Sequence, residues 1–162
     1  MKKSKKRKGT IKNILFVCTG NSCRSVMAEG LLRKLLKDKG IEGITVSSAG
    51  ISAISGFVPM DKTVKAMKKE SIDVSGYKTK RLTADLVNAA DLILTMETMH
   101  KDAVVNIIPD AKEKTYLLRE YINKEDGLPG FAVPDPIGKP FEIYERVLDM
   151  INVSLKELVK KI

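Results

Sequence analysis

The sequence predicts an α/β fold, a single domain in which a parallel sheet is covered by helices on both faces. The main observation is that short apolar runs rich in strand-forming residues alternate with longer segments whose apolar residues recur at helical spacing. The second is the length of 162 residues, of which 43% are hydrophobic and 30% charged, as in one domain with an ordinary core. The third is that no apolar run approaches the ~20 residues needed to span a bilayer.

The first half of the chain contains two predicted strands. Residues 14–17 (Ile-Leu-Phe-Val) form a buried strand that leads through a glycine-containing loop into a helix beginning near Ser25 and ending at Gly40. Residues 44–48 form the second strand. The helix after Pro59 is predicted to pack on the core through Met60, Val64 and Met67.

The second half continues the alternation. A short helix begins at residues 83–86, residues 92–94 form a third buried strand before a helix over residues 97–106, and residues 116–118 form a weaker fourth strand. Residues 123–140 contain so many Pro and Gly residues that we expect a loop. The closing helix should pack on the sheet through apolar residues spaced by three and four, namely Phe141, Tyr144, Leu148, Ile151, Leu155, Leu158 and Ile162.

The net charge of +9 is concentrated at the N-terminus. Residues 1–12 carry seven basic residues and no acidic one, which leaves about +2 for the rest of the chain. We therefore expect residues 1–12 to be a basic flexible tail and residues 13–162 to form the domain. A tail that binds polyanions stays open as an alternative, but we expect no nucleic-acid partner for the folded domain.

The two cysteines indicate a chemical role and a reducing compartment. Cys18 and Cys23 lie five residues apart on one loop, so a disulfide between them could not join distant segments. The basic N-terminus is followed by a short apolar segment without a signal-peptide cleavage pattern. We therefore expect a cytoplasmic protein that does not associate with membranes.

The strongest candidate site is the loop between the first strand and the first helix, Cys18-Thr19-Gly20-Asn21-Ser22-Cys23-Arg24-Ser25. In a parallel sheet, ligands bind beyond the carboxyl ends of the strands, where this loop begins. Five residues between Cys18 and Arg24 allow successive N–H groups to converge as an anion-binding nest beside the helix N-terminus. Gly20 permits close backbone approach, Asn21 tolerates a left-handed conformation, and Arg24 can bind two phosphate oxygens.

Cys18 is the predicted nucleophile of this loop. The N–H dipoles, Arg24 and the helix N-terminus should stabilise a thiolate there. Ser25 could donate a hydrogen bond to the sulfur and assist its departure, whereas Asn21 would brace the loop.

The loop resembles the signature of the low-molecular-weight protein tyrosine phosphatase family, Cys-x-x-Gly-Asn-x-Cys-Arg-Ser, at every fixed position. The resemblance extends over residues 13–162. It implies a phosphatase I-like domain with a four-stranded parallel sheet flanked by helices, and a phosphocysteine intermediate. It also implies a general acid in an Asp-Pro pair, which is Asp135-Pro136 here.

The resemblance implies roles for each candidate residue. Asp135 would protonate the leaving group as Cys18 attacks, and would then deprotonate the water that hydrolyses the phosphocysteine. Arg24 and the loop amides would hold the phosphoryl oxygens. The residues expected to bind the substrate are Thr19, Gly20, Asn21, Ser22, Cys23 and Ser25.

Two positions depart from the family pattern. Val26 replaces a proline that usually follows the Arg-Ser pair, and Tyr77 occupies a place where histidine is common. We therefore expect Ser48 to carry more of the bracing of Asn21.

The family includes enzymes for phosphotyrosine, phosphoarginine and arsenate. Thr19 is the residue type seen in arginine-directed members, although arsenate reductases also carry it, and Ile137-Gly138 leaves the aromatic wall typical of tyrosine-directed members thin. These features favour phosphoarginine slightly, and phosphotyrosine stays open. A thiol-linked arsenate reductase would need two further cysteines, which residues 95–100 lack. A phosphoprotein-binding module without turnover is disfavoured because Cys18, Arg24 and Asp135 are all present.

No cofactor or metal is expected. His100 is the single histidine, and because no cysteine or histidine ligand lies near it in sequence we interpret it as a helix-surface residue. The expected partners are phosphorylated proteins, and the expected state is a monomer.

Overall fold

The computed structural model describes residues 9–122 and 130–162 and contains a four-stranded parallel sheet in the order β2-β1-β3-β4. Its strands are β1 (Asn13–Cys18), β2 (Thr45–Gly50), β3 (Leu92–Thr95) and β4 (Thr115–Leu117). β1 pairs with β2 along its whole length, from Asn13 opposite Thr45 to Cys18 opposite Gly50. The predicted α/β class with a parallel sheet is confirmed. The predicted tail residues 1–8 and loop residues 123–129 lie outside the described residues.

Strand β1 lies between β2 and β3, and the two faces that it presents are each covered by an apolar core. Ile14, Phe16 and Cys18 contribute to one apolar core, and Leu15 and Val17 contribute to the other. A strand with two covered faces reads in sequence as a continuous apolar run, as residues 14–17 do. The position of Cys18 is therefore fixed by core packing on both sides of the strand that ends with it.

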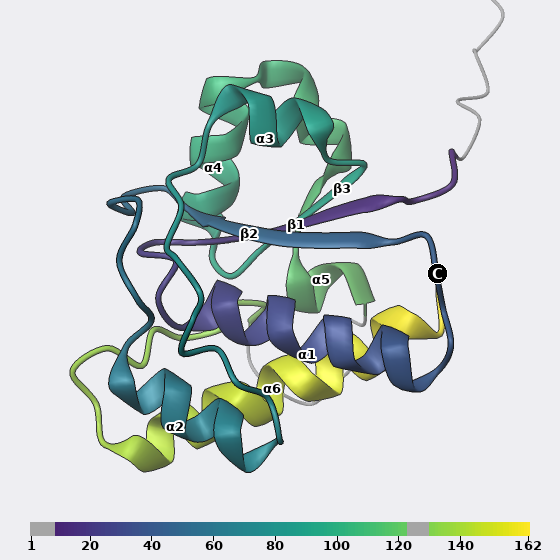
Figure 1. Cartoon of the computed structure of the whole chain (residues 1–162). Coiled ribbons are helices and arrows are strands. Elements are labelled where there is room, and N and C mark those ends of the chain that lie inside the picture. The colour runs from purple at the N-terminus through teal and green to yellow at the C-terminus, as the bar shows by residue number, and fades with distance from the viewer. Residues whose placement is uncertain (1–8, 123–129) are drawn as a thin grey trace, which may run out of the picture.

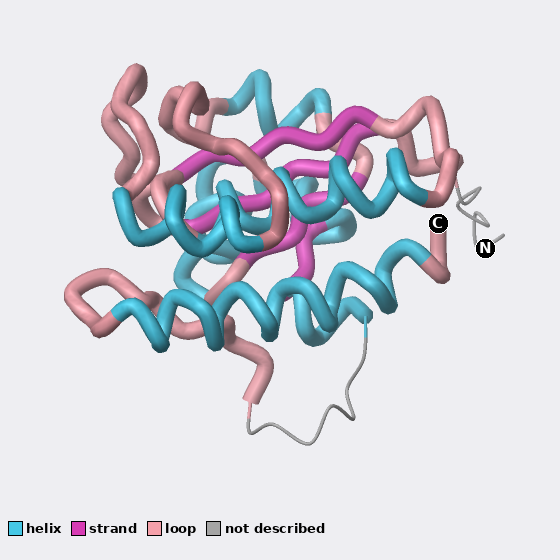
Figure 2. The backbone as a smooth tube through the Cα atoms, turned by 60° about the horizontal axis from the view of Figure 1, so that its bottom comes forward, coloured by secondary structure: helices cyan, strands magenta, loops and turns pink. Residues whose placement is uncertain are grey.

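Helices cover both faces of the sheet (Figures 1 and 2). On one face, α1 (Arg24–Asp38) runs beside α6 (Phe141–Val159), and α2 (Asp61–Lys69) and α5 (Leu118–Ile122) also contact α6. The other face carries α3 (Ala84–Ala89), α4 (Thr98–Ile107) and the 3-10 helix η1 (Pro109–Lys114). The predicted cover on both faces is confirmed.

Helix α6 supplies the largest apolar stripe. Its residues Tyr144, Leu148, Ile151, Leu155 and Leu158 are all buried, as their spacing predicts. Burial of each of the leucine and isoleucine side chains contributes about 1.5–3 kcal/mol. The helix is therefore fixed against α1 and α2.

Two local predictions are wrong. The fourth strand ends at Leu117, and Leu118 begins α5, a helix that the sequence pattern did not predict. The sequence predicts that Met60 packs on the core, but Met60 is 41% exposed, whereas Met67 is fully buried. Met60 is the N-cap of α2 and precedes its first turn, so it does not share the buried face of the helix.

The segment 130–140 contains no helix or strand, as predicted for this part of the Pro- and Gly-rich region. It is attached to the sheet edge through Val133, which is buried and whose N–H donates to Met96 O at 2.8 Å. Met96 follows β3 and donates in turn to Val17 O at 3.2 Å. This attachment brings Asp135 to the carboxyl edge of the sheet.

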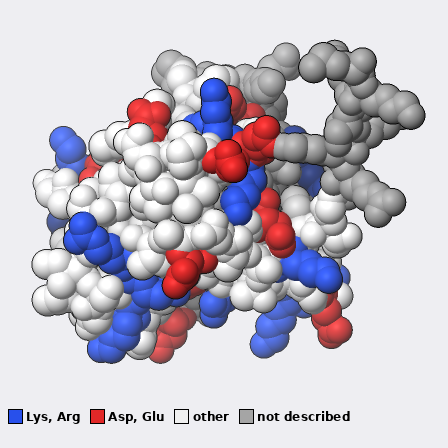
Figure 3. Space-filling view, turned by 90° about the horizontal axis from the view of Figure 1, so that it is seen from above, with Lys and Arg blue, Asp and Glu red and all other residues white. Residues whose placement is uncertain are grey.

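Basic and acidic side chains are interspersed with uncharged residues on the face seen from above (Figure 3). Among the described residues, no helix is both long enough and apolar enough to cross a membrane.

Candidate active site

Cys18 is the last residue of β1 and lies where two adjacent strands send the chain in opposite directions. Helix α1, which follows β1, lies on one face of the sheet, and α4, which follows β3, lies on the other (Figure 1). In parallel sheets such a divergence opens a crevice at the strand ends. Cys18 is therefore located at the preferred binding position of this fold.

The loop after Cys18 turns its carbonyl groups outward. The carbonyl oxygens of Cys18, Thr19 and Ser22 accept hydrogen bonds from the N–H groups of Ile51 (3.0 Å), Ser52 (2.9 Å) and Met60 (3.2 Å), all outside the loop. In a trans peptide the next N–H points opposite to the carbonyl. The following N–H groups therefore face away from these neighbours, toward the interior of the curl, as an anion-binding nest requires.

Asn21 holds the curl together. Its φ of 52° lies in the left-handed region, which asparagine tolerates better than most residues. Its Nδ2 donates to Ser25 Oγ at 2.8 Å and to Ser48 Oγ at 2.9 Å, and its Oδ1 accepts from Lys80 N at 2.8 Å and from Tyr77 OH at 3.1 Å. All four hydrogen-bonding positions of the buried amide are filled.

Ser25 connects this amide to Cys18, the predicted nucleophile. Cys18 Sγ lies 2.9 Å from Ser25 Oγ, and both side chains are buried. Because Ser25 Oγ already accepts a hydrogen from Asn21, its own proton is available for the sulfur. The predicted support of Cys18 by Ser25 thus has the required geometry.

The bracing of Asn21 is shared between two residues. Sequence reasoning gave it mainly to Ser48, which does accept from Asn21. Tyr77 contacts both groups, with its hydroxyl 2.5 Å from Ser48 Oγ and 3.1 Å from Asn21 Oδ1. Burial raises the pKa of Tyr77, so its hydroxyl stays protonated as a donor at neutral pH.

Arg24 is the first residue of α1, is only 2% exposed, and contacts two distant segments through its guanidinium. Its Nη1 donates to Val133 O at 2.8 Å and lies 2.9 Å from Glu97 Oε2. Its Nη2 lies 3.6 Å from Asp135 Oδ2. The predicted phosphate ligand Arg24 and the predicted acid Asp135 are thus brought together from opposite sides of the crevice.

Asp135 is held by a local turn and remains accessible. Its Oδ1 accepts from Ile137 N at 3.0 Å, and its side chain is 40% exposed. A carboxyl group that is oriented but open to solvent can exchange protons with water between reaction steps.

The remaining loop residues occupy different depths. Gly20 and Ser22 are half-buried, while Cys23 is buried beneath the loop. Burial raises the pKa of the Cys23 thiol, which therefore stays protonated at neutral pH.

The prediction that His100 lies on a helix surface is wrong. His100 is fully buried, and its Nε2 lies 2.8 Å from Thr19 Oγ1. The first turn of α4 begins just after β3 and places this side chain against the loop. The local sequence around His100 contains no signal for this contact. The order of the strands brings the start of α4, and with it His100, to Thr19.

Sequence reasoning also gave no role to Glu97 and Gly50. Glu97 pairs with Arg24, and a Cβ on Gly50 would lie 2.6 Å from Thr19 O and 2.7 Å from Asn21 N. Both residues lie at or just after the carboxyl end of a strand beside β1. That position is the signal that could have found them.

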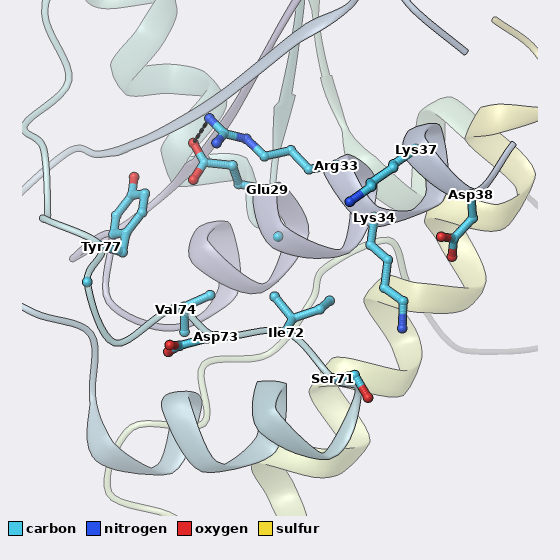
Figure 4. Close-up of a pocket in the computed structure, with 12 residues that line it drawn as sticks. Glu29, Arg33, Lys34, Lys37, Asp38, Ser71, Ile72, Asp73, Val74 and Tyr77 are labelled. Atoms are coloured by element: carbon cyan, nitrogen blue, oxygen red, sulfur yellow. Dashed lines mark ion pairs between the residues drawn. The ribbon is translucent and has the colours of Figure 1, made fainter. Parts of the chain in front are cut away.

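Tyr77 also lines a second pocket of about 570 Å³ beside α1 (Figure 4). Glu29 and Arg33 lie on its wall, with Glu29 Oε1 3.6 Å from Arg33 Nη2. Burial raises the pKa of Glu29 although Arg33 opposes this effect.

Replacement of Gly50 by Ala should weaken the binding of phosphate. The added Cβ would collide with backbone atoms of Thr19 and Asn21, which cannot rotate away. We expect the affinity for inorganic phosphate, measured by calorimetry, to fall at least about tenfold. Gly76→Ala is the matched control, because a Cβ at that position would meet no other described atom within 4 Å. Equal phosphate affinities in the two variants would contradict the close-approach argument.

The buried Glu29 should make the protein less stable as the pH rises. In the folded protein the pKa of Glu29 lies above the ordinary value of 4.5, so the unfolded chain releases this proton at a lower pH than the folded protein does. Above pH 4.5 the unfolded state is therefore stabilised relative to the folded state. Glu29→Gln should therefore lose less unfolding free energy than the wild type between pH 4.5 and pH 7, measured by urea denaturation. Glu42→Gln is the control for removing one exposed carboxylate. Parallel pH curves for wild type and Glu29→Gln would refute this assignment.

Comparison with known proteins gives a consistent result. The chain matches the family model for low molecular weight phosphotyrosine protein phosphatase over residues 13–162. A protein-arginine-phosphatase of Geobacillus stearothermophilus is 34% identical over 149 residues, which cover 92% of this chain and 95% of that protein. The probable low molecular weight protein-tyrosine-phosphatase EpsP of Ralstonia nicotianae is 36% identical over 152 residues, which cover 94% of this chain and 97% of that protein.

A solved structure agrees with the family model and with these two relatives. It is a mutant of the YwlE arginine phosphatase with a phosphorylated active site serine, and it superposes with a TM-score of 0.84 at 32% identity, covering 92% of this chain and 94% of that one. The strand-loop-helix site, the parallel sheet and these matches lead to one conclusion: this chain belongs to the low molecular weight phosphotyrosine protein phosphatase family.

Proposed function

We propose that this protein is a cysteine-dependent phosphatase that removes phosphoryl groups from phosphoarginine or phosphotyrosine in proteins. The observation that carries the proposal is the position of Cys18 Sγ, 2.9 Å from Ser25 Oγ, in a loop whose Arg24 lies 3.6 Å from Asp135 on the facing segment. The names of the relatives, which are arginine and tyrosine phosphatases, support this activity.

In the first step, the Cys18 thiolate attacks phosphorus. The S–P bond forms as the bond from phosphorus to the leaving oxygen or nitrogen breaks, and Asp135 gives its proton to that atom. The phosphorylated active site serine of the YwlE mutant supports an enzyme-bound phosphoryl group at this position of the fold.

In the second step, water hydrolyses the phosphocysteine. Asp135, now a carboxylate, takes a proton from the water as its oxygen bonds to phosphorus, and the S–P bond breaks to release phosphate and the Cys18 thiolate. Ser25 stabilises that thiolate through the hydrogen bond that Asn21 orients.

Arg24 and the loop amides bind the phosphoryl oxygens in both steps. Without substrate, the Arg24 charge is neutralised by Glu97 at 2.9 Å, while the contact with Asp135 is longer at 3.6 Å. An arriving phosphoryl group would take over the Nη2 side of the guanidinium. This exchange leaves Asp135 free to act on the leaving group.

Two features support a protein substrate and, slightly, phosphoarginine. Exposed apolar side chains lie on loops next to the site, Phe57 after β2 and Ile137 after Asp135, and such residues suit contact with another macromolecule. Thr19 gives the pocket a polar wall, and Ile137 gives little aromatic surface for a tyrosine ring.

We further propose that the protein works as a monomer in the cytoplasm without a cofactor. The free thiols of Cys18 and Cys23 suit a reducing compartment. A thiol-linked arsenate reductase needs two further cysteines for its redox relay, and the whole sequence contains only two cysteines, so we do not favour that activity. The mixed charges on the face in Figure 3 do not favour nucleic-acid binding there.

Substitutions of Cys18 and Asp135 should test their proposed roles as nucleophile and general acid. Cys18→Ser should abolish turnover, because a serine oxygen leaves phosphorus far less readily than a thiolate when water attacks the phosphoryl group. Asp135→Asn should lower kcat/KM, which reports formation of the phosphocysteine alone, roughly 10²- to 10³-fold on phosphotyrosine peptides, and less on p-nitrophenyl phosphate, whose leaving group needs no proton. Asp110→Asn, an exposed aspartate in η1, is the control. If Asp135→Asn affects both substrates equally, Asp135 is not the acid.

Thr19→Ile should shift the substrate preference toward phosphotyrosine. The aliphatic side chain removes the polar wall that suits a guanidino group and adds surface for a phenyl ring. We expect the ratio of kcat/KM for phosphoarginine over phosphotyrosine peptides to fall at least about tenfold. An unchanged ratio would remove Thr19 from the specificity argument.

A further inference from the structure

His100 is the one described side chain that fixes the hydroxyl of Thr19 from outside the loop, and it is itself fixed on two sides. Its Nε2 lies 2.8 Å from Thr19 Oγ1, and its Nδ1 accepts a hydrogen bond from Glu97 N at 3.0 Å. The ring is fully buried, whereas Thr19 is half-buried at the wall of the crevice. A buried ring with both nitrogens bonded has one orientation available to it.

The contact with Glu97 determines the tautomer. A backbone N–H can only donate, so Nδ1 carries no proton in this arrangement. In the neutral ring the proton is then on Nε2, and the hydrogen bond runs from His100 to Thr19.

The ring is also neutral under ordinary conditions. Burial, followed by the nearby charge of Arg24, lowers the pKa of His100 to about 4, although Glu97 and Asp135 oppose this shift. The direction of the hydrogen bond to Thr19 therefore stays the same throughout the neutral pH range.

This contact decides which part of Thr19 faces the crevice. Rotation about χ1 would exchange the hydroxyl and the methyl group, and the bond from Nε2–H holds the oxygen in place. One oxygen lone pair accepts from His100. The other faces Arg24 Nη2, which lies 3.5 Å from Thr19 Oγ1, at the outer limit of a hydrogen bond, and which would leave it for an arriving phosphoryl group.

We propose that His100 is a positioning residue that presents the Thr19 oxygen as an acceptor to the leaving group and so favours phosphoguanidines over phosphorylated phenols. A guanidino group carries N–H donors that need acceptors, whereas a phenyl ring has none to offer at the same position. A Thr19 that turned its methyl group into the crevice would leave those donors unpaired and would suit the ring better. This inference rests on the proposed function and deepens its substrate class.

The activity test compares two amides at residue 100. His100→Asn can keep the acceptor for Glu97 N but has no donor that reaches Thr19, whereas His100→Gln places an N–H₂ group near the Nε2 position. We expect His100→Asn to lower the ratio of kcat/KM for phosphoarginine over phosphotyrosine peptides roughly three- to tenfold, the worth of one hydrogen bond. His100→Gln should restore it to within about twofold. A purely structural role would lower both rates together and leave the ratio unchanged, which would overturn the proposal.

A double-mutant cycle isolates the pair. In a Thr19→Val background, which keeps the shape of threonine without its hydroxyl, His100→Asn should not change the ratio further. The same fall of the ratio in this background would show that His100 acts through another group, and the proposal would fail.

The single histidine of the sequence allows a test that does not depend on activity or on the folding of a His100 variant. Nitrogen-15 NMR of the wild-type imidazole should show a neutral ring protonated on Nε2 at pH 7, and Thr19→Val should shift the Nε2 signal. An Nδ1-protonated or charged ring, or a signal that Thr19→Val leaves unmoved, would overturn the proposal. If the wild type hydrolyses neither substrate, the proposed function fails while this measurement still decides whether His100 orients Thr19.

Discussion

The side-chain amide of Asn21 makes four hydrogen bonds, and these join the loop to two elements that are distant in sequence. They reach Ser25 at the start of α1, Ser48 in β2, and Tyr77 and Lys80 in the segment after α2. Asn21 has a left-handed conformation in a loop whose N–H groups must stay free for a ligand. Few backbone hydrogen bonds can therefore stabilise it. The amide replaces them, and it also orients Ser25 toward Cys18. Loss of this one interaction would thus affect loop shape and thiolate support together.

The sheet makes this arrangement possible because parallel strands deliver their carboxyl ends to one edge. β1 brings Cys18, β2 brings Ser48 and Gly50, and β3 leads to Glu97 and His100. The loop can approach β2 closely only because Gly50 has no side chain, which leaves its space to Thr19 O and Asn21 N. Tight packing of backbone on backbone restricts the movement of the loop, as the proposed nucleophile Cys18 requires.

The parts of the site that could be predicted from sequence are those whose residues lie next to one another in the chain. The strand before Cys18, the helix after it and the left-handed Asn21 all follow from local pattern, and the four strands follow from apolar runs. His100 and Glu97 could not be placed in this way, because only the order of strands in the sheet brings them to the loop, and Tyr77 reaches the loop through the segment after α2. His100 shows the limit most clearly: its local sequence suits a helix surface, yet it is fully buried against Thr19. Asp135 was found through the family pattern, since a turn aspartate before proline carries no chemical signal of its own.

The two carboxylates around Arg24 are held differently, and this difference suits their proposed roles. A guanidinium that is 2% exposed needs a counter-charge at every stage, because an unpaired buried charge is strongly destabilising. Glu97 provides it at 2.9 Å from Nη1, next to the Val133 carbonyl, and need not move when a phosphoryl group binds on the Nη2 side. Asp135 lies farther away at 3.6 Å and is more exposed, so it contributes less to neutralising Arg24 and can give and take a proton without leaving the arginine unpaired. A site with Asp135 as the only partner of Arg24 would have to lose that pairing each time the acid works, and the presence of Glu97 removes this conflict.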